Sequence, residues 1–311
     1  LHTGAGKIVL KGTNTQTIDG NGIFGNLELN NTNGDTAPVS LIANTTVNGT
    51  LNLLSDKIFN IASYNLNIAS SGSISATTFS NLCYIRTSGN SGDGGLTKVY
   101  STTTAFLFPL GVSNYTPASI GLSGAPTTYG SITLKPVNYE HPNVTAISRS
   151  LNYFWRVQST GFTLGTATVT HSYKYDDANI IEVGDVSENE YVAARFDATT
   201  NTWTNGDDTD VDEAGNIIGE PGTGSFLENV PFIDGDYTAG DNIGDNPFGT
   251  PLVFYSRQTG LWSSTNTWST DAILKHTGAT DGRVPGARDI VIIGGLDSVY
   301  VSIYACLLYT S

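Results

Sequence analysis

Apolar and polar residues alternate over short runs along most of the chain, and no stretch of twelve residues repeats apolar positions at helical spacing. Threonine, valine, isoleucine, tyrosine and phenylalanine dominate these runs, whereas glycine, asparagine, aspartate and serine separate them. Branched and aromatic side chains suit pleated strands, and the separating residues suit turns. The pattern therefore predicts an all-β protein that is built from many short strands.

The first region, residues 1–82, contains three similar segments that resemble copies of one unit. These segments are 25–31, 49–55 and 64–70. An irregular period of about 20 residues is typical of a β-solenoid, in which each coil buries its apolar face on the next. Asparagine recurs in the segments, and it tolerates the left-handed backbone that solenoid corners often need. We predict right-handed β-helix-like coils over 1–82, with a plain antiparallel meander as the alternative.

The second region, residues 83–247, has longer strands that alternate or nearly alternate, as a sheet with one buried face requires. They are 130–135, 153–157, 167–173 and 191–196. A hairpin is expected around Asn201. Strands of this length without helices predict an antiparallel β-sandwich. The third region, residues 251–303, has the pattern of a further β module that has only begun, and its last two strands would start another solenoid.

Composition limits the classes of partner. At about 150 residues per domain, 311 residues correspond to two domains and part of a third. Hydrophobic residues make up 39%, which is enough for a sizeable core, and only 14% are charged, against a typical value of about 25%. The net charge of −14 argues against nucleic acid and against an anionic membrane surface as partners. No apolar run approaches the roughly 20 residues of a membrane-spanning helix, so no membrane insertion is expected.

Two cysteines, Cys83 and Cys306, are too few and too far apart for a disulfide framework or a zinc site. Cys83 is expected to be a small buried hydrophobic residue. Residues 304–311 resemble translated adapter sequence and are expected to be a non-native tail. Methionine is absent, so we expect the chain to begin inside a longer reading frame.

Four short elements follow one another in order along the chain. They are the strand repeat at 20–31, the Phe-Pro-Leu-Gly and Tyr-Thr-Pro-Ala pair at 108–118, the Asp-Tyr-Thr-Ala-Gly link at 236–240 with Phe-Gly at 248–249, and a module opening with two tryptophans at 254–292. Together they resemble elements of the large, multi-modular, adhesin-like surface proteins of Bacteroidetes that are exported by type IX secretion. The resemblance implies alternating β modules and a location that is extracellular or on the outer cell surface. No sorting domain is present in the sequence, so export is an expectation only.

Few residues suggest catalysis. The four histidines, His2, His141, His171 and His276, are isolated from one another, and surface or strand positions are the simpler interpretation of each. The nucleophile-elbow pattern G-x-S-x-G is absent, and the glycine-rich stretch 89–95 lacks the Lys-Ser/Thr of a phosphate-binding loop. We therefore expect no catalytic residues and predict that the chain is not an enzyme.

Acidic residues are concentrated in one segment. From Asp176 to Asp245 the chain has 18 acidic residues and one basic residue, Arg195. Within it, Asp208, Asp210 and Asp212 have the spacing of the first three ligands of a calcium loop. The loop is not an EF-hand, because glutamate occupies the position of its glycine and glycine the position of its last glutamate. The alternatives are a non-standard Ca²⁺ site and a solvated acidic hairpin.

A second acidic run favours the solvated interpretation more strongly. It comprises Asp234, Asp236, Asp241 and Asp245.

Tryptophans are the candidate ligand-binding residues, since an exposed indole can stack on a sugar face. The candidates are Trp203, Trp262 and Trp268, with packing in a core as the alternative for each, whereas Trp155 is expected in the core. The sequence predicts an extracellular structural or adhesion-type protein whose partner is a glycan or a surface protein. Carbohydrate binding or carbohydrate processing, with or without dependence on calcium, is the alternative function, and a stalk stiffened by calcium is a third.

Overall fold

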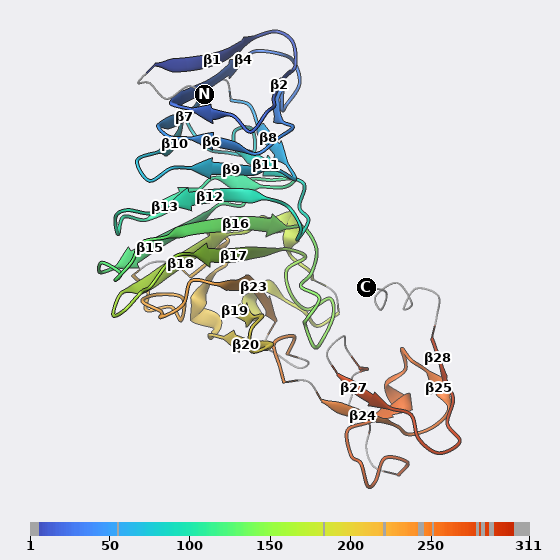
Figure 1. Ribbon diagram of the computed structural model, residues 1–311. Coiled ribbons are helices and arrows are strands. Elements are labelled where there is room, and N and C mark those ends of the chain that lie inside the picture. Colours follow the sequence, from blue (N-terminus) through green and yellow to red (C-terminus); the bar gives the residue numbers. More distant parts are fainter. Residues whose placement is uncertain are drawn as a thin grey trace.

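The computed structural model describes residues 6–54, 56–182, 184–219, 222–241, 246–250, 252–277, 280, 284–285 and 289–301. The described chain is all-β, as the alternation predicted, and its strands stack like rungs from the N-terminal end toward β20 (Figure 1). The helical residues lie in four short 3-10 turns. These are η1 (Asp177–Asn179), η2 (Glu188–Glu190), η3 (Asp208–Asp210) and η4 (Thr265–Thr267). In the described part of the chain, no helix has the length and apolar character needed to cross a membrane.

The N-terminal region is a β-solenoid of about five turns with three parallel sheets. The first sheet contains β1 (Lys7–Gly12), β4 (Asn26–Asn31), β7 (Thr50–Leu53) and β10 (Ser73–Ala76). The second contains β2 (Gln16–Ile18), β5 (Val39–Leu41), β8 (Phe59–Ala62), β11 (Ile85–Thr87) and β14 (Leu110–Gly111). The third begins with β3 (Ile23–Phe24), β6 (Thr45–Val47), β9 (Asn65–Ile68) and β12 (Gly95–Val99). The parallel pairing confirms the solenoid and excludes the meander.

The coils stack because equivalent residues face the same interior. Leu27 of β4 lies opposite Leu51 of β7, and both are fully buried. Asparagine supports the corners, as expected from its frequency. The Asn26 side chain accepts the N–H of Thr50 from the next coil at 2.8 Å, and Asn65 donates to the carbonyl of Gly94 at 3.0 Å. These bonds satisfy backbone groups where the ladders are interrupted.

The third solenoid sheet continues directly into the β-sandwich. After β12 it adds antiparallel strands and reaches nine strands in all. These strands are β16 (Ser131–Val137), β17 (Phe154–Thr160), β23 (Gly235–Asp241), β19 (Tyr191–Asp197) and β20 (Thr202–Asn205). The facing sheet contains β13 (Phe106–Phe108), β15 (Ala118–Ser123), β18 (Thr168–Lys174), β22 (Ile217–Ile218) and β21 (Val211–Asp212). Parallel pairing reaches β12 and β14, so the solenoid extends past residue 82, where the sequence predicted its end.

One hydrophobic core fills both parts. It includes Leu27 and Leu66 of the solenoid together with Leu134 and Trp155 of the sandwich. Trp155 and Cys83 are buried, as the sequence predicted. The hairpin around Asn201 is also confirmed, since this residue has a φ of 55° in the connection between β19 and β20.

The C-terminal described segment forms two small sheets away from the stack (Figure 1). Its strands are β24 (Val253–Ser256), β25 (Gly260–Leu261), β26 (Trp268–Ser269), β27 (Ile290–Ile292) and β28 (Val299–Tyr300). The pairs β24–β27 and β25–β28 are both parallel, which is the pattern of one coil laid on another. Cys306 and the expected tail at 304–311 lie outside the described residues.

Candidate functional site

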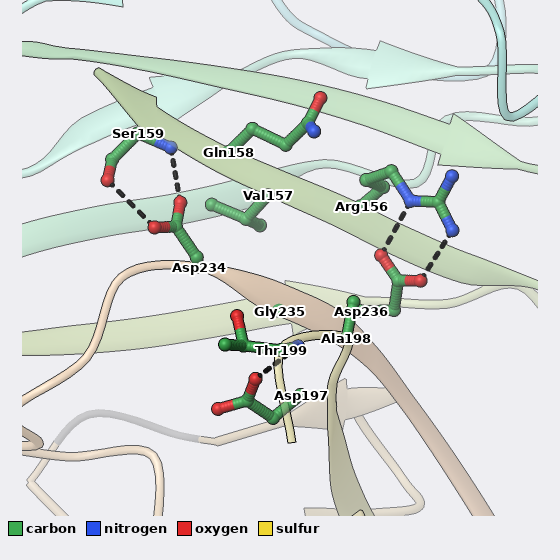
Figure 2. Close-up of a pocket in the computed structure, with 10 residues that line it drawn as sticks. All are labelled: Arg156, Val157, Gln158, Ser159, Asp197, Ala198, Thr199, Asp234, Gly235 and Asp236. Atoms are coloured by element: carbon green, nitrogen blue, oxygen red, sulfur yellow. Dashed lines mark hydrogen bonds and ion pairs between the residues drawn. The ribbon is translucent and has the colours of Figure 1, made fainter. Parts of the chain in front are cut away.

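A hollow of about 280 Å³, lined by polar and apolar groups, opens on the sandwich where β17 and β19 separate (Figure 2). The strand between them, β23, begins at Gly235, which pairs with Val157. Beyond that point β17 and the turn after β19 have no strand between them, and their side chains border the hollow. Its lining comprises Arg156, Val157, Gln158, Ser159, Asp197, Ala198, Thr199, Asp234, Gly235 and Asp236.

A buried carboxylate, Asp236, forms the floor of the hollow. Arg156 donates to it twice, from Nε to Oδ1 at 2.8 Å and from Nη2 to Oδ2 at 2.6 Å. His141 approaches from the other side, with Nε2 at 2.9 Å from Oδ2. Because the N–H of Asn143 donates to Nδ1 of His141, the proton lies on Nε2 and faces Asp236. His141 thus fixes the Asp236 carboxylate, and the two bonds from Arg156 to that carboxylate hold the guanidinium in one orientation.

The pKa values of this pair follow from its contacts. Burial alone would raise the pKa of Asp236, but hydrogen bonds and charge from Arg156 and His141 outweigh burial and lower it. The hydrogen bond from Asp236 in turn raises the pKa of Arg156, against the opposing effect of burial. Both groups are thus charged at neutral pH, and the floor of the hollow is an ion pair.

Two further carboxylates stand at the walls, and each is fixed by backbone N–H groups. Asp234 accepts from the N–H and the hydroxyl of Ser159. Asp197 accepts from the N–H of Thr199 at 2.8 Å and from Nη2 of Arg195 at 3.2 Å. These bonds fix the carboxylate positions, so the hollow presents acceptors whose geometry exists before any ligand arrives.

Two donor groups in the hollow have no protein partner among the described residues. They are Nη1 of Arg156 and the side-chain amide of Gln158, which project from the same face of β17 (Figure 2). Side chains at positions i and i+2 of a strand point to the same side. The hollow therefore combines free donors with fixed acceptors within one small volume.

A second hollow, of about 270 Å³, contains a buried lysine. Nζ of Lys98 donates to the carbonyls of Ala69, Ser70 and Gly72 at 2.7, 3.0 and 2.6 Å. An ammonium group has three protons, so these bonds use all of its donors. Burial lowers the pKa of Lys98. Lys98 therefore has a structural role, since it binds the backbone carbonyls of a solenoid corner.

The predicted calcium residues lie in and after η3. Asp210 accepts from the N–H of Phe226 at 2.9 Å and from that of Asp207 at 2.9 Å, and Asp212 accepts from Gly215 at 3.1 Å. Nothing is described for the side chain of Asp208. Within the described ranges, no group of three or more His, Cys, Asp or Glu side chains could hold a metal ion. The bonds of Asp210 and Asp212 are those of turn-forming residues, and calcium binding remains a prediction.

The second acidic run differs from the expected solvated hairpin. Asp236 is buried in the ion pair described above, and Asp241 is buried with its carboxylate 2.6 Å from Nη2 of Arg149. Asp234 alone of the described three is exposed, and Asp245 lies outside the described residues. The prediction was wrong for the buried pair because their basic partners lie 80 and 92 residues away in sequence.

The predicted sugar-stacking tryptophans do not form an exposed platform. Trp268 is fully buried, with Nε1 donating to the carbonyl of Trp262 at 2.8 Å, so its prediction as a ligand-binding residue was wrong. Trp262 packs edge-on against Trp268 with ring centroids 5.1 Å apart. Trp203 is half-buried against His141 and Phe248, and its Nε1 donates to a backbone carbonyl at 2.8 Å. The contacts of these three indole rings are packing contacts within the protein.

Sequence analysis missed the hollow and its principal residues, Arg156 and Gln158. Their alternation with Trp155 and Val157 along one strand was the available signal, since it places both polar side chains on the outer face. His141 was considered only as an isolated residue, because its partner Asp236 lies 95 positions away in the sequence.

Comparisons with protein-family models, curated proteins and solved structures found no match to this chain.

Proposed function

We propose that the chain is a rigid, non-catalytic segment of an extracellular surface protein, with a structural or adhesive role. The observation that carries this proposal is the nine-stranded sheet, which runs without a break from β3 to β20. At about 4.8 Å between neighbouring strands, such a sheet spans roughly 40 Å. A continuous ladder of this length couples the solenoid to the sandwich mechanically.

The shared core supports the same role. Close-packed interiors have low compressibility and transmit strain, so a single core leaves no natural hinge between solenoid and sandwich. Solenoids expose long, regular faces that suit contact with other molecules. The resemblance to multi-modular secreted proteins and the low content of charged residues favour an extracellular location, with a glycan or a surface protein as partner.

Small-angle scattering and surface labelling test the proposal. We expect the scattering of the full chain to fit one rigid body through residue 250, and an antibody raised against the chain to label intact cells of its source. A hinge between solenoid and sandwich would contradict the mechanical role. Labelling only after permeabilisation would contradict the location, and turnover of any polysaccharide by the purified chain would contradict the non-catalytic role.

A further inference from the structure

We propose that the hollow between β17 and β19 binds one neutral sugar residue of a glycan, with Gln158, Arg156 and Asp234 as the principal contacts. This inference rests on the proposed function and deepens it by naming the class of sugar and the site that binds it. It is separable from the structural role, because the stack of strands would be equally rigid with the hollow empty. The volume of about 280 Å³ lies just below the usual range of ligand pockets and suits a single ring.

The chemistry of the lining favours a ligand that both donates and accepts. Each sugar hydroxyl has one proton to give and two lone pairs, as a serine hydroxyl does. Nη1 of Arg156 and the amide of Gln158 offer protons, while the carboxylates of Asp197 and Asp234 offer lone pairs (Figure 2). A simple anion would leave the acceptors unused, and a simple cation would leave the donors unused.

Preorganisation makes such contacts effective. Asp236 holds the Arg156 guanidinium by two bonds, and Ser159 and Thr199 hold the two wall carboxylates. Groups that are fixed in advance lose little conformational entropy when a ligand binds. The ligand therefore meets a set of polar groups that needs no rearrangement.

An exposed aromatic ring lies near Arg156, outside the residues that line the hollow. Tyr139 is 39% exposed and packs edge-on against Phe154, with ring centroids 5.7 Å apart. The same Phe154 ring lies 5.6 Å from the Arg156 guanidinium carbon. Tyr139 is thus an exposed aromatic face near the Arg156 guanidinium, and such a face suits the C–H side of a sugar ring whose hydroxyls bind in the hollow.

Charge favours a neutral sugar over an acidic one. The lining contains three carboxylates, Asp197, Asp234 and Asp236, and one guanidinium, that of Arg156. Arg156 is paired with Asp236, and Asp197 is paired with Arg195 from outside the lining. Among the described ion pairs, Asp234 has no basic partner, so an added carboxylate on the ligand would face its negative charge. Uncharged hexoses and N-acetylhexosamines are the expected class.

The test begins with the full chain on an array of neutral and acidic glycans, in the presence of calcium and again with EDTA. Hits are then titrated in solution with glucose, galactose, mannose, N-acetylglucosamine and glucuronic acid. We expect binding of a neutral sugar that is unchanged by EDTA. A blank array under both conditions, a preference for glucuronic acid or loss of binding with EDTA would each overturn the proposal.

Variants locate the site. Gln158 is exposed and has no hydrogen bond to the described protein, so Gln158→Ala removes ligand contacts without disturbing the fold. Loss of one neutral hydrogen bond corresponds to about three- to tenfold weaker binding. Tyr139→Ala is expected to weaken binding to a similar extent. Gln258→Ala is the matched control, because Gln258 is also exposed but lies in the C-terminal segment.

The proposal is overturned if both Gln158→Ala and Tyr139→Ala bind like the parent chain, or if Gln258→Ala weakens binding as much as they do. Scattering of the same variants separates the two proposals. A rigid body that binds no sugar would refute the sugar site alone, and a hinged body that binds sugar through Gln158 would refute the structural role alone.

Discussion

A buried neutral histidine makes the stability of the sandwich dependent on pH. His171 of β18 is fully buried between the two sheets, 2.9 Å from the hydroxyl of Tyr173 and 3.1 Å from the carbonyl of Phe232. The carbonyl can only accept, so Nε2 carries the proton and Nδ1 accepts from Tyr173. Both ring nitrogens are satisfied in the neutral form. In the imidazolium form the Tyr173 bond would have to reverse, with Nδ1 donating to the hydroxyl oxygen, and the hydroxyl proton would need another acceptor.

Burial lowers the pKa of His171 to about 4, and the charge of Arg195 acts in the same direction while the Phe232 bond opposes it. In the unfolded chain this group titrates near 6.5. Between these values the unfolded state binds the proton and the folded state does not, so stability falls as the pH falls. At 1.36 kcal/mol per pKa unit, the loss amounts to about 3 kcal/mol between pH 7 and pH 4.

Urea unfolding, followed by tryptophan fluorescence at several pH values from about 7 to about 4, measures this loss. In His171→Gln the amide can donate to Phe232 and accept from Tyr173, and it does not titrate. The parent chain should lose about 3 kcal/mol more than His171→Gln over this range. His276→Gln, at an exposed histidine, is the control and should follow the parent. Parallel curves for the parent and His171→Gln would refute the reasoning.

Three other substitutions test the fold. Asp236→Asn should destabilise the folded chain by about 2 kcal/mol, because a neutral amide no longer compensates the Arg156 charge. The free energy of unfolding in urea measures this loss, and an unchanged value would contradict the buried ion pair. Lys98→Met should cost about 3 kcal/mol or more, since three carbonyls lose their donor; an unchanged melting temperature would show that water replaces the ammonium. Gly49→Ala would place a Cβ 2.6 Å from the carbonyl oxygen of Gly25, so the folded chain should lose about 1–3 kcal/mol of stability. Calorimetry measures this loss, and unchanged stability would mean that the backbone at this corner shifts to accommodate the Cβ.

Local pattern was sufficient for the class of fold and for much of the core. The alternation Leu51-Asn52-Leu53 specifies a strand with one buried face, and the repetition of that pattern specifies stacked coils. The burial of Trp155 and Cys83 followed from the apolar strands around them. Such features depend on neighbours within a few residues, which is the range over which periodicity carries information.

The candidate site could not be predicted in this way, because its residues are far apart in the sequence. Arg156 and Asp236 are 80 residues apart, and only the pairing of β17 with β23 places them opposite each other. The same sequence stretch that contains Asp236 was therefore interpreted as solvated. The tryptophans show a related limit, since the sequence left both sugar stacking and core packing open for Trp268. Only the tertiary structure shows that it packs fully inside a small sheet.

The sequence by itself determined an all-β chain with parallel coils at one end, because side-chain alternation and turn residues act locally. Only the tertiary structure decided that solenoid and sandwich share one sheet and one core, and that the acidic segment supplies a buried ion pair and the walls of a hollow. The physical reason is that strand register brings together residues that are distant in sequence. Charge pairing and burial are then set by these neighbours in space.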